Sequence, residues 1–352
     1  MGVKITGIGS YIPSEIAKNE HFGKHHFYNE DGTRFGHEND VIIEKFKAIT
    51  GISERRYLPK TLVTSDIASF AAENALKNAS LNKEELDYII VAHNYGDVNY
   101  DSVQSDTVPS IATRVKHNLK IEKPTCVAYD VLFGCPGWIE GMIQANAFIK
   151  SGIAKKCLVI GAESLSRVVD PHDRDSMIYS DGAGAAIVEK SSEEGGILSH
   201  YSATFAFEEA HFIYFGESNN LELKDTRRYI KMYGRKIYEF ALSNVPDAMK
   251  TCLDQSGISV DEVKMIFIHQ ANEKMDEAIV NRFYKLYDRT PPKDSMPMSI
   301  DKLGNSSVAT IPTLYDLVLN NELKGYSVKE NDVVIFASVG AGMNINAIVY
   351  RI

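Results

Sequence analysis

Short apolar runs alternate with longer amphipathic stretches along most of the chain. A strand is predicted over residues 3–13 (VKITGIGSYIP), and residues 126–133 (CVAYDVLF) and 155–164 (KKCLVIGAES) are typical of strands as well. The stretch 136–152 (PGWIEGMIQANAFIKSG) follows the second of these and predicts a helix. Apolar strands separated by helical stretches indicate sheets covered by helices on both faces, so the pattern predicts an α/β protein.

The pattern occurs twice, at an offset of about 177 residues. Three matches appear in the same order: 75–94 (ALKNASLNKEELDYIIVAHN) with 252–272 (CLDQSGISVDEVKMIFIHQAN), 155–164 with 332–342 (DVVIFASVGAG), and 182–190 (GAGAAIVEK) with 340–352 (GAGMNINAIVYRI). A shared order at nearly one offset predicts that the chain consists of two copies of one alternating unit.

The two predicted halves are residues 1–190 and 191–352. A chain of 352 residues exceeds the size at which one core usually keeps growing, which agrees with this division. The segments 19–40 and 191–233 match poorly between the halves and are predicted to be surface excursions or caps.

Composition excludes several classes of function. A net charge of −9 argues against general nucleic-acid binding. The four cysteines show no paired spacing, so neither a disulfide framework nor a structural metal is expected. The chain has no signal-peptide core and no run near the ~18 apolar residues of a membrane span. These features predict a cytoplasmic protein that does not associate with a membrane and has no metal site.

Cys135 lies in a turn between a predicted strand and a predicted helix. Gly134 permits a tight turn and Pro136 suits a first helical position, which places Cys135 at or next to the helix N-cap. The positive end of a helix dipole lowers the pKa of a thiol and favours the reactive thiolate. The alternative is a buried structural cysteine, and this stretch alone leaves both interpretations open.

Two further polar residues occupy corresponding positions in the second half. His269 ends a predicted buried strand, and Asn305 follows glycine before a predicted helix, opposite Cys135 in the repeat. A lone histidine here is more often structural, and a lone Gly-Asn pair is more often a turn. All three lie at element ends, where open α/β folds place chemistry, so we expect them to converge in one pocket.

The chain resembles the thiolase-fold condensing enzymes of the β-ketoacyl-acyl-carrier-protein synthase III type. The resemblance runs along essentially the whole chain and is carried by GCPGW around Cys135, the stretch 151–189 with its DGAGA, HQAN at 269–272, GNSS at 304–307 and the terminal GAGMNINAIV. It implies a layered αβαβα fold with mixed sheets, made of two duplicated halves. It also implies an acyltransferase of fatty-acid or specialised lipid or polyketide synthesis, which extends an acyl group by decarboxylative Claisen condensation.

The resemblance assigns roles to individual residues. Cys135 attacks an acyl thioester and holds the acyl group covalently. His269 and Asn305 then donate hydrogen bonds to the enolate formed when malonyl-acyl carrier protein loses carbon dioxide. The backbone N–H groups of Cys135 and Ala341 form the oxyanion hole, although relatives usually have glycine at position 341. No tightly bound cofactor is implied, and the expected substrates are acyl-CoA or phosphopantetheine-linked thioesters. The expected partners are acyl carrier protein and a second copy of the chain in a homodimer.

Substrate-binding positions depart from the family pattern. The tryptophan that stacks on the adenine of coenzyme A falls at Lys45, and its arginine companion falls at Ile49. Arg174 matches the other arginine of that site, although an ion pair with Asp170 or Asp173 explains it equally well. These differences argue against acetyl-CoA as the primer and favour an acyl carrier protein or a longer acyl-CoA.

Val108 stands where relatives often have a phenylalanine that reaches into the neighbouring subunit's acyl pocket. Its smaller side chain predicts room for a longer or branched acyl group.

Basic residues near the expected tunnel mouth suit an acidic carrier protein. The run 224–236 (KDTRRYIKMYGRK), which contains the predicted substrate-site residue Gly234, has six basic residues against one acid, and Lys274 follows HQAN. An ordinary solvated helix face is the alternative. The histidine-rich insertion 21–40 is predicted to be a solvated loop rather than a metal site.

Three other functions remain as alternatives. A papain-like thiol hydrolase also uses cysteine, histidine and asparagine, but it predicts secretion and disulfides. A non-catalytic partner subunit of a condensing complex typically lacks the nucleophile, whereas this chain retains it. A thiolase-fold enzyme that joins two acyl-CoAs is the nearest alternative. A Rossmann dinucleotide site is excluded because GIGSYI and GAGAAI lack the third glycine.

Overall fold

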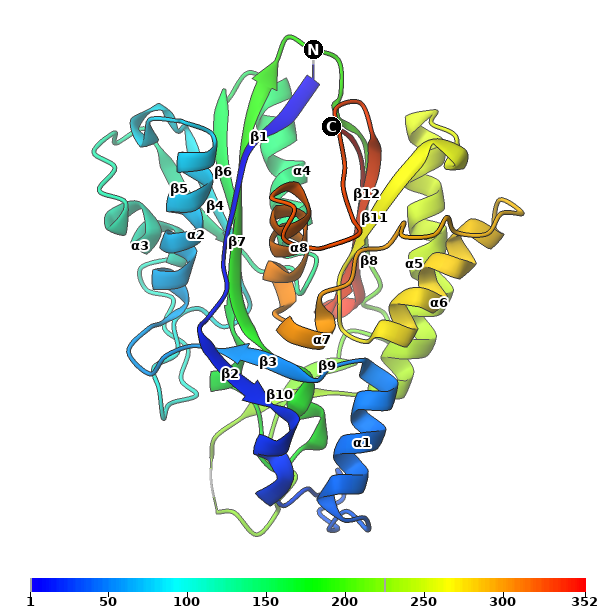
Figure 1. The fold of residues 1–352 in the computed structure, drawn as a ribbon. Coiled ribbons are helices and arrows are strands. Elements are labelled where there is room, and N and C mark those ends of the chain that lie inside the picture. Colours follow the sequence, from blue (N-terminus) through cyan, green and yellow to red (C-terminus); the bar gives the residue numbers. More distant parts are fainter. Residues whose placement is uncertain (1, 225) are drawn as a thin grey trace.

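The computed structural model describes residues 2–224 and 226–352, and two mixed sheets form its centre (Figure 1). The first sheet has the strand order β1-β7-β6-β4-β5. Its strands are β1 (Gly2–Tyr11), β4 (Tyr88–Ala92), β5 (Val127–Val131), β6 (Lys156–Ser164) and β7 (Asp181–Ser191). β1 pairs antiparallel with β7 and β7 antiparallel with β6, whereas β4 is parallel to both β6 and β5.

The second sheet repeats this arrangement, with the strand order β11-β12-β13-β8. Its strands are β8 (Gly196–Thr204), β11 (Val263–Ile268), β12 (Val333–Gly340) and β13 (Asn344–Arg351). β8 pairs antiparallel with β13, β13 antiparallel with β12, and β12 parallel with β11, as their counterparts do in the first sheet. The predicted α/β fold of two duplicated halves with mixed sheets is confirmed. The division at residue 190 stays a prediction.

Helices form layers between and outside the sheets. α4 (Gly137–Lys150) and α8 (Thr310–Leu319) lie between the two sheets (Figure 1), and their apolar side chains share one buried cluster with both of them. α2 (Thr64–Asn78) and α3 (Ile111–Asn118) cover the outer face of the first sheet. α5 (Gly234–Ser256) and α6 (Glu273–Lys285) cover the outer face of the second. The resulting order of layers is αβαβα.

Two glycines allow the central helices to approach the first sheet closely. A Cβ on Gly161 in β6 would overlap the carbonyl oxygen of Val308, and a Cβ on Gly184 in β7 would lie 2.7 Å from Cβ of Pro312. Such short separations leave no room for a side chain. The small residues of the DGAGA stretch therefore serve the packing of α8 against β7.

Smaller elements gather at one end of the molecule (Figure 1). They are the paired strands β2 (Glu15–Lys18) and β3 (Glu54–Tyr57), the paired strands β9 (Ile213–Gly216) and β10 (Tyr229–Met232), and helices α1 (Asn39–Thr50) and α7 (Ile300–Leu303). Short 3-10 helices are η1 (Asn19–Lys24), η2 (Lys83–Glu85), η3 (Leu165–Arg167), η4 (Arg174–Ile178), η5 (Val260–Glu262), η6 (Ser307–Ala309) and η7 (Ala341–Met343). The paired strands and helices at this end lie outside the five layers.

The structure corrects the prediction for two poorly matching segments. Residues 191–233 are not only a surface excursion, because they contain β8, the counterpart of β1. β8 is an edge strand in which Gly196 and Ile197 are buried and the later residues are half-buried or exposed, so it lacks the continuous apolar run of the inner strands. In the insertion 21–40, Phe22 and Phe27 are buried against Phe46 of α1, so this segment has a core of its own. In the described part of the chain, no helix has the length and apolar character needed to cross a membrane.

Candidate active site

A cavity of about 970 Å³ opens at the end of the molecule that carries the small elements. Cys135 from the first half lines it together with His269, Asn305 and Ala341 from the second. Each of these residues lies in a connection at the end of a sheet strand or just before a central helix. The predicted convergence of the three polar residues in one pocket is therefore observed in the structure.

The turn that carries Cys135 is pressed against the turn after β12. Gly134 has a φ of +65°, and a Cβ on it would lie 2.6 Å from the backbone nitrogen of Ala341. A Cβ on Gly340 would overlap the backbone nitrogen of Cys135. Both positions therefore require glycine, and their contact brings the backbones of residues 135 and 341 together. Pro136 is the N-cap of α4 rather than its first helical residue, so Cys135 precedes the cap.

The expected lowering of the Cys135 pKa is wrong. Burial raises the pKa of the thiol to about 11, and a hydrogen bond from Ser307 offsets only part of this effect. The nearby Glu163 carboxylate raises the pKa further. Removal of water disfavours the charged thiolate, so the resting thiol is protonated at neutral pH.

His269 follows β11, and its backbone N–H donates to the carbonyl oxygen of Ala337 at 2.9 Å. Burial lowers the pKa of its imidazole to about 4, so the ring is neutral at pH 7. Across the described residues, Nδ1 of this ring has no hydrogen-bond partner. A neutral imidazole donates one hydrogen bond and accepts another, which suits a group that faces a reacting oxygen.

Asn305 is held by backbone and side-chain hydrogen bonds. Its N–H donates to the carbonyl oxygen of Ile178 at 3.0 Å, and its carbonyl oxygen accepts from Ser180 N–H at 2.8 Å. The side-chain Oδ1 accepts from the backbone N–H of Ser307 at 2.8 Å. Because the oxygen is engaged there, the NH₂ group is the part of the carboxamide available to a ligand in the cavity.

Ala341 begins the turn between β12 and β13. Asn344 Nδ2 donates to the carbonyl oxygen of Ala341 at 2.9 Å and to that of Phe133 at 3.3 Å, which ties this turn to the turn that holds Cys135. Non-glycine residues with positive φ include Met343 but not Ala341. Alanine therefore fits a position where relatives have glycine, and its backbone N–H is retained.

Substrate-binding residues divide into those at the cavity and those outside it. Arg174, Gly234, Lys45 and Ile49 line the cavity, as does Phe35 of the insertion. The Arg174 guanidinium lies 4.8 Å from the centre of the Phe35 ring. Arg174 Nε also lies 3.6 Å from an Asp175 carboxylate oxygen, so its acidic partner is neither of the two that were expected.

Two predicted residues are not among those that line the cavity, Lys274 and Val108. Lys274 is exposed in the first turn of α6. The Val108 side chain is 85% exposed.

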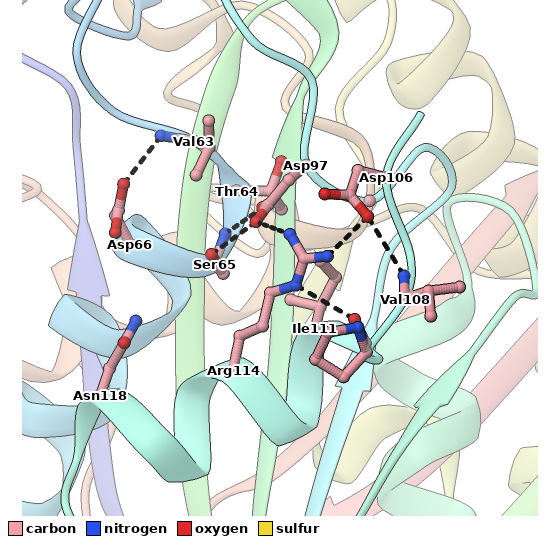
Figure 2. Close-up of polar contacts among 12 residues, drawn as sticks. Val63, Thr64, Ser65, Asp66, Asp97, Asp106, Val108, Ile111, Arg114 and Asn118 are labelled. Atoms are coloured by element: carbon pink, nitrogen blue, oxygen red, sulfur yellow. Dashed lines mark hydrogen bonds and ion pairs between the residues drawn. The ribbon is translucent and has the colours of Figure 1, made fainter. Parts of the chain in front are cut away.

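The loop around Val108 is held by an ion-pair network (Figure 2). Arg114 of α3 binds Asp97 at 2.6 Å and Asp106 at 2.7 Å. The Asp106 carboxylate in turn accepts from the backbone N–H of Val108 at 3.2 Å. These contacts hold the loop, while the Val108 side chain stays exposed and outside the lining of the chain's own cavity.

The basic run 224–236 is not a single solvated helix face, although residue 225 lies outside the described residues. Lys231 lies in β10, is buried, and binds Asp170 at 2.6 Å and Asp173 at 3.1 Å. Among the described basic residues of this run, Arg235 and Lys236, at the start of α5, are the two that line the cavity. No cluster of metal-binding side chains occurs within residues 2–224 and 226–352, including the histidines of the insertion.

Three residues beside the nucleophile were missed from the sequence. Ser307 donates to Cys135 Sγ at 3.3 Å, and Asn94 Nδ2 donates to Ser307 Oγ at 3.1 Å and to Glu163 at 2.7 Å. Asn94 lies just after β4, and Glu163 is the second-last residue of β6. Both are polar residues at the end of a buried strand, which is the feature that identified His269. The repeat was a further signal, because AHN (92–94) aligns with HQAN (269–272).

Comparison with known proteins places the chain in a family. The models of 3-oxoacyl-[acyl-carrier-protein (ACP)] synthase III and of its C-terminal part match residues 129–204 and 253–352. The beta-ketoacyl-[acyl-carrier-protein] synthase III of Aquifex aeolicus is 32% identical over 354 residues, covering 100% of both chains. That of Oceanobacillus iheyensis is 33% identical over 353 residues, covering 100% of this chain and 99% of the relative.

Solved structures agree with the sequence comparison. The crystal structure of the Aquifex aeolicus 3-oxoacyl-[acyl-carrier-protein] synthase III matches with a TM-score of 0.81 and 30% identity over the full length of both chains. The synthase III structure from Thermus thermophilus matches with the same TM-score and 28% identity, over 99% of both chains. Full-length similarity in sequence and fold leads to one conclusion: the chain belongs to the β-ketoacyl-acyl-carrier-protein synthase III family of thiolase-fold condensing enzymes.

Proposed function

We propose that the protein is an acyltransferase that joins a cysteine-bound acyl group to malonyl-acyl carrier protein and releases a β-ketoacyl product. The observation that carries this proposal is the convergence of Cys135, His269 and Asn305 on one large cavity. The largely apolar wall of the cavity includes Ile213, Ile230 and Met343, which suits an acyl chain.

The first step transfers the acyl group to the enzyme. Cys135 Sγ attacks the thioester carbonyl carbon, the new C–S bond forms, and the bond to the departing thiol breaks. The proton of the Cys135 thiol ends on the departing thiol, and neutral His269 is able to accept and return it. Backbone N–H groups of Cys135 and Ala341 stabilise the negative oxygen of the tetrahedral intermediate, and the close contact of the two turns supports this role.

The second step forms the carbon–carbon bond. Malonyl thioester loses carbon dioxide, and the electron pair left behind forms an enolate whose oxygen accepts hydrogen bonds from His269 and Asn305. The enolate carbon attacks the acyl carbonyl, the C–Sγ bond breaks, and Cys135 regains a proton from solvent. The lowered pKa of His269, about 4, supports this role because the ring enters the step as a neutral donor. Protein groups supply every contact, so no tightly bound cofactor is required.

We further propose that the acyl donor is borne by a carrier protein rather than by free coenzyme A. Phe35 covers one face of the Arg174 guanidinium, which is the surface on which a planar base would stack. Lys45 and Ile49 offer no second stacking surface on α1. Arg235, Lys236 and the exposed Lys274 provide positive charge for an acidic carrier.

The quaternary structure and location belong to the same proposal. A rigid loop that exposes an apolar side chain, Val108, favours a homodimer in which the partner covers it. We place the enzyme in the cytoplasm, since all four of its cysteines are unpaired.

The mass of the intact protein after incubation with a panel of acyl-CoAs and acyl-carrier-protein thioesters tests the proposal. One acyl adduct is expected on the wild-type protein, given by carrier thioesters, and none on Cys135→Ala. The panel members that label the wild type identify the primer. If a folded wild-type protein accepts no acyl group, the covalent mechanism fails and the partner-subunit function replaces it.

A further inference from the structure

A chain of hydrogen bonds leads from a buried carboxylate to the sulfur of Cys135. Glu163 Oε2 accepts from the backbone N–H of Asn94 at 2.8 Å and from its Nδ2 at 2.7 Å. Asn94 Nδ2 also donates to Ser307 Oγ at 3.1 Å. Ser307 Oγ lies 3.3 Å from Cys135 Sγ, within hydrogen-bond reach for sulfur. The chain joins the two halves of the molecule at the nucleophile.

The donor and acceptor properties of these groups determine which way each hydrogen bond in the series runs. The NH₂ group of Asn94 only donates hydrogen bonds, and the Glu163 carboxylate selects it over the amide oxygen. Because the Ser307 hydroxyl accepts one of these N–H groups, its own proton is free to point at Cys135 Sγ. A hydroxyl without such a neighbour rotates among several acceptors. Asn94 therefore decides which way the Ser307 proton faces.

The fold holds each member of the chain in place. Glu163 is the second-last residue of β6 and is fully buried, and Asn94 follows β4, the strand parallel to β6. Ser307 has a φ of +53°, a conformation that is uncommon for residues with a side chain. This conformation lets its N–H bind Asn305 Oδ1 while its hydroxyl reaches Cys135. One serine thus orients both the nucleophile and the predicted enolate donor.

We propose that Ser307 and Asn94 are positioning residues for the covalent step: Asn94, anchored by Glu163, aims the Ser307 hydroxyl proton at the sulfur of Cys135 and so stabilises its thiolate. This inference rests on the proposed function, because it takes Cys135 as the nucleophile. The thiolate occurs twice in the cycle. It forms as the thiol loses its proton to attack the donor, and it forms again when the C–Sγ bond breaks and its electron pair returns to sulfur. Ser307 keeps its own proton in both steps.

Other titratable groups around the sulfur define the conditions for a test. His269 lies on the same cavity and is neutral above pH 6, since burial lowers its pKa to about 4. Tyr95 and Tyr179 face the thiol, and burial raises the pKa of both hydroxyls, so they remain neutral in the test range. Glu163, which also faces His93, has a pKa raised by burial to about 7. Above pH 8 Glu163 is mostly ionised and the other groups keep their charge, so the pH dependence of alkylation reports mainly the thiolate of Cys135.

The test is the rate of alkylation of Cys135 by iodoacetamide between pH 8 and 9.5, followed by intact mass. Ser307→Ala removes the hydroxyl, and Ser307→Gly does so while matching the positive φ, which protects the fold. A hydrogen bond to a charged group favours its ionised form, so each variant is expected to react about tenfold more slowly at a given pH. Ser306→Ala, in the same turn, is the matched control and is expected to react like the wild type.

A double-mutant cycle separates orientation from general damage to the site. Asn94→Ala is expected to slow alkylation in the wild-type background and to have no further effect in Ser307→Ala, because it acts through the serine. Additive effects of the two substitutions, or unchanged rates in both serine variants, overturn the proposal. Alkylation that depends on Ser307 in a protein that accepts no acyl thioester would leave this inference standing while the proposed function fails.

Discussion

The cavity has a floor, formed by Cys135, His269, Asn305 and Ala341, and a rim, formed by Arg174, Lys45, Ile49 and Phe35. The two regions differ in how firmly hydrogen bonds and packing hold their side chains. At the floor, each predicted catalytic side chain is held by specific hydrogen bonds or backbone contacts, as Asn305 is by Ile178, Ser180 and Ser307. At the rim, Arg174 keeps about half of its side chain exposed, its ion-pair distance is 3.6 Å, and its stacking partner comes from an insertion. The floor tolerates little change, whereas the rim is able to vary.

This difference separates reaction from substrate. The floor carries the residues of the family motifs, and the rim carries the departures at Lys45 and Ile49. A change at the floor should abolish chemistry for every substrate, because interactions made in the transition state are lost. A change at the rim should alter the preference among substrates while the chemistry continues.

The largest effect is expected from Asn305→Asp. Aspartate retains an oxygen for the Ser307 N–H but replaces the NH₂ donor by a negative oxygen, which repels the enolate. Condensation is expected to fall about 100- to 1,000-fold, the usual cost of one oxyanion donor, while acylation of Cys135 continues. Product formation and acyl-enzyme mass measure the two steps separately. Asn281→Asp on the exposed surface of α6 is the control, and near-normal condensation in Asn305→Asp would remove the distinction between floor and rim.

The second prediction concerns the pH dependence of the floor. The pKa of Cys135 is raised to about 11, so its thiolate fraction should grow about tenfold per pH unit up to pH 9.5. Alkylation of the wild-type protein by iodoacetamide should therefore rise about 100-fold between pH 7.5 and 9.5. Cys135→Ala identifies the labelled site, because the other three cysteines are buried. A plateau below pH 8 would mean that the end of α4 outweighs burial.

Much of the floor was predictable because its residues mark element ends in a duplicated pattern. The inner strands keep continuous apolar runs, which made both copies visible; Cys135 and His269 follow sheet strands, and Asn305 precedes a central helix. Asn94 and Glu163 lie at strand ends as His269 does and were detectable by the same rule, whereas Ser307 was missed because its contact with Cys135 joins two distant turns. No local pattern indicates that a serine hydroxyl will meet a thiol 172 residues away.

The state of the thiol and the shape of the rim required the structure. Burial raises the pKa of a thiol and a helix end lowers it, and the sequence does not report how deeply the turn is buried. The contact of Phe35 with Arg174 depends on how the insertion folds against α1, and loop conformation has the weakest sequence signal. β8 was missed for a related reason, since an edge strand exposes polar residues on one face.

A smaller effect is expected from Phe35→Ala at the rim. Removal of the ring exposes the Arg174 guanidinium to a planar base, so acyl-CoA should become a better donor, with a KM about fivefold lower, in line with a cation–π contact of about 1 kcal/mol. The KM for the matching acyl-carrier-protein thioester should not change. Phe207→Ala, which removes a fully solvated ring (97% exposed), controls for loss of surface area. Equal changes for both donors would show that the ring merely narrows the entrance.

The smallest effect is expected from Val108→Phe, which tests whether a second chain completes the rim. Val108 is 85% exposed and does not line its own chain's cavity, so a larger side chain affects acyl length only by entering a partner's cavity. In a homodimer, the longest accepted acyl group should shorten by a few carbons, at about 1 kcal/mol for each methylene that no longer fits. Val108→Ala should extend the range or leave it unchanged, and light scattering gives the oligomeric state of each variant. A dimer with an unaltered acyl profile in both variants would assign acyl selection to the chain's own cavity and leave Val108 as a contact residue alone.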